Sequence, residues 1–115
     1  MTAGLDTTIR PSWTPCGPPK AALEASSASW AGDPEGTGVA VNVPIPDGHA
    51  DTPLVPLASR PDRSFPVRPE RMAAPILWLL SNASDGVNGR RFVANDRDPD
   101  LPVAEAAEQA SAPVA

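Results

Sequence analysis

The sequence predicts a small α/β fold in which two helices alternate with two strands. Residues 20–32 are rich in alanine and lack proline, which favours a helix, whereas 37–43 is rich in β-branched residues, which favours a strand. A second helix, 69–81, and a second strand, 90–94, follow in the same order. Because parallel strands need crossover connections that are usually helical, this alternation indicates a parallel sheet.

Length and composition limit the chain to one small domain of marginal stability. It has 115 residues, of which 16 are proline, and proline cannot donate a backbone hydrogen bond. The net charge of -5 argues against nucleic acid and anionic membranes as partners. The longest apolar run, 72–80, is less than half of the ~20 residues that cross a bilayer. With no secretory signal at its start, the chain is expected to be cytoplasmic.

The first helix is expected to end near Gly32, because Asp33 and Pro34 stop it. Leu23 and Trp30 lie seven residues apart, which places both on one apolar face. That spacing predicts that Trp30 is a core or interface residue.

The strand 37–43 is almost entirely apolar, which predicts burial on both faces of the sheet. Pro44 is expected to end it. The proline-rich loop 44–68 is long enough to be a lid, a binding loop or disordered chain. It holds the only histidine, His49, which alone supports neither a metal site nor a catalytic triad.

The second helix is predicted to begin at Pro69, with the Glu70 carboxylate near the positive end of its dipole. Pro75 removes one internal hydrogen bond and is expected to kink the helix. Trp78 lies on the apolar face, so it is expected in the core or an interface.

A glycine turn leads from this helix to the second strand. Gly86 and Gly89 bracket the turn, and Arg90 with Arg91, close to several aspartates, is expected to form a solvated surface. Residues 103–115 are expected to be a flexible or weakly helical tail.

Three segments resemble the C-terminal part of the short-chain dehydrogenase/reductase family. TPCGPPKAALEA at 14–25 is similar to the catalytic helix, GVAVNVPIPDG at 38–48 to the strand that follows it, and 68–91 to the penultimate helix and the turn into the last strand. The resemblance implies that residues 1–102 form the C-terminal part of a Rossmann-like doubly wound parallel sheet, incomplete, with two helices and two strands. It also implies descent from oxidoreductases that use NAD or NADP.

The catalytic residues of the family are largely replaced in this chain. In the family a tyrosine and a lysine four residues apart supply a phenol whose pKa is lowered by a neighbouring cation. Lys20 matches the lysine, but Cys16 stands at the tyrosine position, and the serine position falls at Ala3 or Gly4. A thiol is shorter by a ring, so the resemblance implies a non-functional centre.

Helix geometry is predicted to separate the two surviving positions further. A residue before proline disfavours the helical conformation, so Pro18 is expected to be non-helical and the helix to begin at about Pro19. Cys16 would then lie off the face that carries Lys20. The alternative of a reactive thiol beside Lys20 stays open, because a nearby cation stabilises thiolate.

The cofactor contacts of the family appear only as remnants. The resemblance places vestigial cofactor-binding positions at Lys20, Pro46 and Thr52, with Asp47 in place of a glycine. The family's glycine-rich phosphate-binding unit would precede Met1. The glycines at 32, 36 and 38 follow a helix, whereas phosphate binding needs a strand that leads into a helix. We therefore expect this chain to bind neither NAD nor NADP.

Two functions of different classes are compatible with these features. The first is a truncated and inactive relative of the dehydrogenases. The second is a non-catalytic interaction protein that docks onto an intact family member, as a homo- or hetero-oligomer, because the matching helices and last strand form subunit interfaces in the family. Absence of a stable fold is a third possibility, since an incomplete parallel sheet exposes apolar edges.

Overall fold

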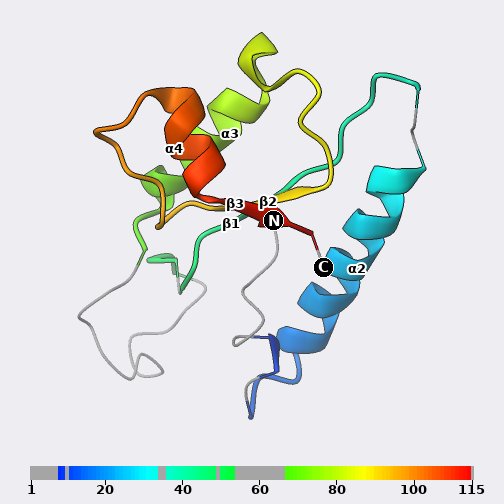
Figure 1. The fold of residues 1–115 in the computed structure, drawn as a ribbon. Coiled ribbons are helices and arrows are strands. Elements are labelled where there is room, and N and C mark those ends of the chain that lie inside the picture. The colour runs from blue at the N-terminus through cyan, green and yellow to red at the C-terminus, as the bar shows by residue number, and fades with distance from the viewer. Residues whose placement is uncertain (1–7, 10, 34–35, 49, 54–66, 115) are drawn as a thin grey trace.

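The computed structural model describes residues 8–9, 11–33, 36–48, 50–53 and 67–114. Helices and strands alternate along the chain, as the sequence predicts, and a third helix and a third strand follow them (Figure 1). The elements are α2 (Gly17–Gly32), β1 (Val43–Ile45), the 3-10 helix η2 (Pro69–Met72), α3 (Ala73–Leu79), the 3-10 helix η3 (Asn82–Ser84), β2 (Arg90–Val93), α4 (Val103–Gln109) and β3 (Ser111–Pro113).

The sheet is mixed, with the strand order β1-β2-β3. β1 and β2 are parallel, with Val43 opposite Arg91, and β2 and β3 are antiparallel. The parallel pair confirms the α/β class, but the expectation of only two strands is wrong. β3 lies in the expected tail and pairs with the edge of β2 that β1 does not occupy. Hydrogen bonds flank this pairing: Val93 N–H donates to Ala110 O (2.8 Å) and Val114 N–H donates to Gly89 O (3.0 Å).

β1 lies later in the chain than predicted and contains Pro44. Ala94 N–H donates to Ile45 O at 2.8 Å, so the backbone of Ile45 faces β2. The backbone groups of Pro44, one residue earlier, point the other way, and the N–H that proline lacks is not needed in the ladder with β2. The predicted buried strand at 37–43 is correct only at Val43, which begins β1 and is buried; it is wrong for the residues before it, since 36–40 is exposed and Val39 is 60% exposed.

Helices lie on both sides of the sheet, with α3 and α4 on one side and α2 on the other (Figure 1). On one face, Val43, Ile45 and Val114 form a cluster with Ala28 of α2. On the other, Trp78 of α3, Phe92 of β2 and Ala107 of α4 form a second cluster. The core therefore has two small halves separated by the sheet, and the prediction that Trp78 belongs to the core is confirmed.

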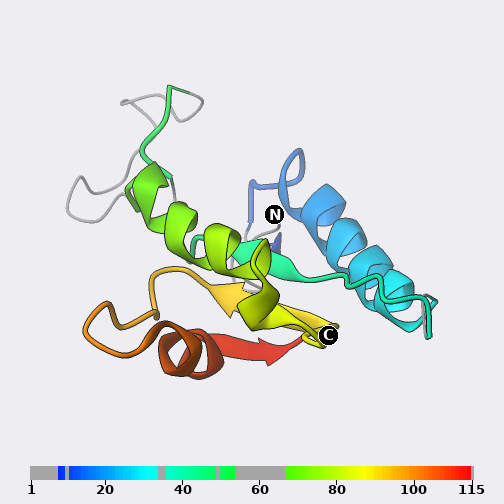
Figure 2. The same cartoon turned by 90° about the horizontal axis from the view of Figure 1, so that it is seen from above.

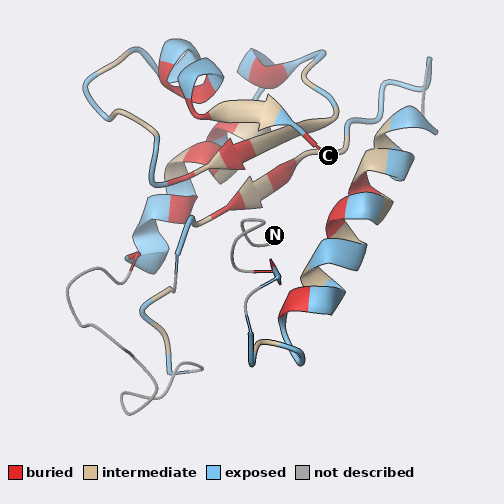
Figure 3. Cartoon of the chain, turned by 60° about the horizontal axis from the view of Figure 1, so that its bottom comes forward, coloured by how far each residue is buried: buried red, intermediate tan, exposed pale blue. Residues whose placement is uncertain are grey.

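α2 faces the sheet with polar and small residues. Its buried residues are Gly17, Glu24 and Ser27, and Figure 3 shows how few buried positions α2 has. Glu24 pairs with Arg91 of β2, whereas Gly17 lies against Thr8. Ser27 satisfies its hydroxyl by donating to Leu23 O at 2.8 Å. Trp30 is 51% exposed, so it is not a core residue.

α2 begins at Gly17 and not at Pro19, and Pro18 is helical. The preceding turn sets this path: Cys16 N–H and Gly17 N–H both donate to Trp13 O, at 2.9 and 2.7 Å. Prolines are compatible with the first turn because its N–H groups have no partner within the helix. The predicted end at Gly32 is confirmed.

The second predicted helix begins at Pro69, as expected, but it consists of two parts, η2 and α3. Pro75 is the third residue of α3, where a backbone N–H would have no partner within that helix. The glycine turn is also present: Gly86 and Gly89 have φ of 81° and 67°. Among the described residues, no helix is both long and apolar enough to cross a membrane.

The ends of the long loop lie together. Ala50 and Val67 form an isolated parallel bridge, and Asp51 N–H donates to Val67 O at 3.0 Å. Most of the predicted loop, 54–66, and His49 lie outside the described residues.

Candidate functional site

Cys16 and Lys20 lie at the start of α2. Cys16 is the N-cap residue, its backbone is already in the helical region, and its carbonyl accepts from Lys20 N–H at 3.3 Å. The two residues are therefore one helical turn apart, and the prediction that Cys16 lies off the face of Lys20 is wrong. The thiol is exposed and Lys20 is half-buried.

The two other predicted cofactor positions follow β1. Pro46 and Thr52 are both half-buried, and Thr52 N–H donates to Ala50 O at 2.8 Å. Asp47, between them, is exposed and has φ of +60°, a conformation that favours glycine. In both Figure 1 and Figure 2 the start of α2 lies apart from the chain that follows β1. The predicted residues thus form two groups and not one compact site.

The glycines at 36 and 38 lie in the exposed connection from α2 to β1. This is the helix-to-strand setting that the sequence indicates, and it does not aim a helix N-terminus at a phosphate group. Among the residues that the structure describes, no cluster of three or more His, Cys, Asp or Glu side chains could hold a metal ion.

Arg91 does not form the expected solvated surface. Its guanidinium is paired with the Glu24 carboxylate of α2, and the two side chains are 24% and 10% exposed. Arg91 Nε and Nη2 both donate to the same oxygen of Glu24, Oε1. This ion pair attaches α2 to β2 across the sheet face, and sequence spacing gives no signal for it.

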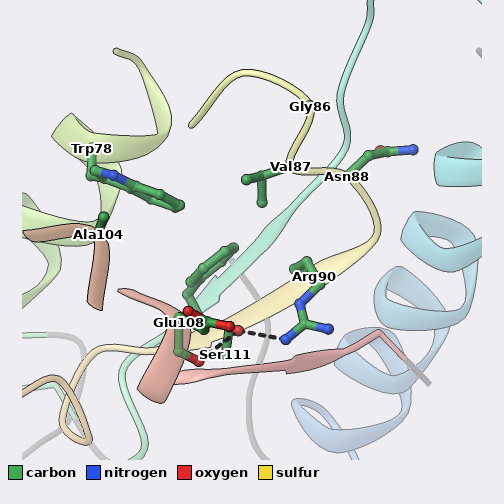
Figure 4. Close-up of a pocket in the computed structure, with 9 residues that line it drawn as sticks. Trp78, Gly86, Val87, Asn88, Arg90, Ala104, Glu108 and Ser111 are labelled. Carbon is green, nitrogen blue, oxygen red and sulfur yellow. Dashed lines mark hydrogen bonds between the residues drawn. The ribbon is translucent and has the colours of Figure 1, made fainter. Parts of the chain in front are cut away.

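A pocket of about 400 Å³ lies between α3, α4 and the β2–β3 pair (Figure 4). Trp78 and Phe92 form its apolar part, with their ring centroids 5.5 Å apart and an edge-to-face angle of 62°. Arg90, Glu108 and Ser111 supply polar groups. The sequence does not predict this pocket, because three of its nine lining residues, Ala104, Glu108 and Ser111, come from the segment expected to be a tail.

Arg90 is held in place within that wall. One of its guanidinium nitrogens, Nη2, donates to Ser111 Oγ at 2.6 Å, and Ser111 Oγ donates to Glu108 O at 2.9 Å. These two hydrogen bonds join β2 to the end of α4 and the start of β3. Arg90, expected on a solvated surface, is half-buried instead.

A second hollow, of about 340 Å³, lies at the carboxyl ends of the parallel strands. Arg68, Arg71 and Arg97 line it around Ala94, whose N–H bonds to the end of β1. Ligands of open α/β sheets commonly bind at this edge. Arg97 follows the end of β2, whereas Arg68 and Arg71 follow the end of the long loop, so the fold brings them to one hollow.

Comparison of the chain with protein-family models, with curated proteins and with solved structures yields no match.

Proposed function

We propose that this chain is a relative of the short-chain dehydrogenases/reductases that does not transfer hydride. The observation that carries the proposal is the order α2, β1, α3, β2, with β1 and β2 parallel and helices on both sheet faces. This is the arrangement expected for the C-terminal part of a Rossmann-like doubly wound sheet. α2 begins within the first of the three segments that resemble the family, β1 lies within the second and α3 within the third, and this order supports the proposal.

The replacement at position 16 supports the loss of activity. A carbonyl reduction needs a proton donor at the carbonyl oxygen, and the family uses a phenol beside a lysine. The Cys16 thiol keeps the one-turn spacing to Lys20 but does not extend as far as a phenol. Because the Cys16 thiol is exposed, it does not by itself hold a carbonyl substrate in a fixed orientation.

Cofactor binding is part of the same proposal. The exposed glycines after α2 do not form a phosphate site, and Asp47 places a carboxylate where the resemblance puts a glycine near the nicotinamide. We infer that these 115 residues alone bind neither NAD nor NADP and act in the cytoplasm.

The test is binding and turnover with the purified chain. We expect no saturable heat with NADH or NADPH in titration calorimetry, and no oxidation of either cofactor with a panel of carbonyl substrates. Lys20→Gln and Arg97→Gln serve as a matched pair, since each removes one positive charge. Carbonyl-dependent oxidation that disappears in Lys20→Gln and persists in Arg97→Gln would contradict the proposal.

Exposed apolar side chains favour a second candidate, a non-catalytic protein that docks onto an intact dehydrogenase of this family. Leu77 and Leu80 of the α3 segment are 66% and 79% exposed, and Trp30 of α2 is also exposed. Exposed apolar groups on elements that form subunit contacts in the family suit such an interface.

Docking is tested with a purified full-length family member as the partner. We expect co-elution with the chain in gel filtration, and loss of co-elution in Leu77→Ser/Leu80→Ser. Val103→Ser, which removes a third exposed apolar residue outside α3, is the control. Elution of the chain as a monomer, with no dehydrogenase bound, would refute the docking function.

A further inference from the structure

We propose that the pocket between α3, α4 and the β2–β3 pair binds a small monocarboxylate with an aromatic or other flat apolar body. Its wall includes α4 and β3, which lie beyond the residues that resemble the dehydrogenases. The inference therefore does not depend on the proposed function. Small-molecule pockets typically have volumes of ~300–1,000 Å³, and about 400 Å³ lies within that range.

The apolar part of the pocket suits an aromatic ring. Trp78 and Phe92 meet edge to face at 5.5 Å, and Val87 and Ala104 complete this side of the wall (Figure 4). Ring edges and faces at such angles accept a further ring in an offset or edge-to-face contact. Trp78 and Phe92 are themselves only 9% and 2% exposed, so a flat apolar ligand would contact mainly the half-buried Val87 and the exposed Ala104 beside this ring pair.

Arg90 selects the charge of the ligand. Its Nη2 is hydrogen-bonded to Ser111 Oγ, and within the described residues its guanidinium makes no ion pair. The bond to Ser111 fixes the plane of the guanidinium while its other N–H groups can still donate. A planar guanidinium with free donors binds a carboxylate better than a neutral group does.

Trp78 provides an independent indication that the wall is incomplete. Its indole Nε1 is buried and has no hydrogen-bond partner among the described residues, although the side chain lines the pocket. Buried donors are rarely left without an acceptor in folded proteins, and the exceptions often mark places where a ligand or a water completes the bonding.

The remaining polar groups limit the ligand to one negative charge. The Asn88 side chain is already engaged, because its Nδ2 donates to Ala31 O and its Oδ1 accepts from Val41 N–H. The exposed Glu108 carboxylate also lines the pocket and opposes a second anionic group. Removal of that charge should therefore strengthen binding of an anion.

The experiment uses 1-naphthylacetate as the probe and 1-naphthylacetamide as its neutral counterpart. Binding is followed by the indole N–H resonance of Trp78 in two-dimensional NMR, assigned with Trp13→Phe and Trp30→Phe. We expect a saturable shift with the carboxylate and at least ten-fold weaker binding of the amide. Arg90→Gln should weaken binding of the carboxylate about ten-fold, as expected for one lost charge-assisted hydrogen bond, and leave the amide unchanged.

Charge-matched variants decide between this pocket and the other hollow. Glu108→Gln should tighten binding of the carboxylate, and Arg97→Gln should leave it unchanged. The proposal is overturned if millimolar 1-naphthylacetate produces no saturable shift of the Trp78 resonance, if the amide binds as tightly, or if Arg97→Gln is as damaging as Arg90→Gln. Should Arg90→Gln fail to fold, unaltered or weaker binding in Glu108→Gln overturns it equally.

Discussion

Removal of the Glu24 carboxylate is expected to weaken the attachment of α2 to the sheet, which Ala28 also supports by packing on β1. Glu24 has only 10% of its side chain exposed, and its partner Arg91 has 24%. Exposed ion pairs contribute roughly 0–1 kcal/mol, whereas loss of one partner from a buried pair costs about 3–5 kcal/mol. For a pair with this intermediate burial, loss of Glu24 alone should cost about 2 kcal/mol, and most of this cost should appear as coupling energy to Arg91.

The coupling energy is measured by a double-mutant cycle of Glu24→Gln and Arg91→Gln, with urea unfolding followed by circular dichroism. For a domain of this size, each kcal/mol shifts Tm by about 4–8 °C, so Glu24→Gln alone should lower Tm by about 10 °C. Asp33→Asn, which removes an exposed carboxylate at the end of the same helix, is the control and should show no coupling to Arg91→Gln. A measured Glu24–Arg91 coupling below about 0.5 kcal/mol, the level of independent sites, would refute the reasoning.

Three further outcomes follow from the packing and from the exposure of the thiol. Phe92→Ala should cost about 3–5 kcal/mol of unfolding free energy, because Phe92 is buried against Trp78; an unchanged urea midpoint would exclude Phe92 from the core. Gly17→Ala should destabilise the chain, because a Cβ there would lie 2.1 Å from Thr8 O. A Cβ at Gly32 meets no atom within 4 Å, so Gly32→Ala should stabilise α2 by about 0.5–1 kcal/mol. Equal thermal midpoints for the two variants would contradict the close approach at Gly17. Cys16 should react with a thiol reagent in the native protein at nearly the rate seen in urea, because its side chain is exposed; native-state protection would show that the start of α2 is covered.

Several boundaries of the fold were predictable because short-range chemistry sets them. α2 ends at Gly32, and the second helical segment starts at Pro69. The glycines at 86 and 89 make the turn into β2. Each signal acts within a few residues, through a missing N–H or a positive φ. The alternation of helix and strand follows from these signals, and the parallel pairing of β1 and β2 was predictable from that alternation.

The candidate sites were less predictable, because they depend on residues that meet only in the folded chain. Cys16 and Lys20 stand out by their spacing alone, and the hydrogen-bonded turn at Trp13 decides that they share a helix face. The pocket wall joins Trp78 to Ser111, and no local pattern relates two positions so far apart in sequence.

The sequence by itself determined the class of the fold, the order of the first four elements and the spacing of Cys16 from Lys20. Only the tertiary structure decided that β1 includes Pro44, that residues 111–113 add an antiparallel strand, and that Glu24 meets Arg91. The physical reason is that strand pairing and buried charge pairs are satisfied by groups distant in the chain. A proline that looks like a strand terminator is acceptable when its missing N–H points away from the neighbouring strand.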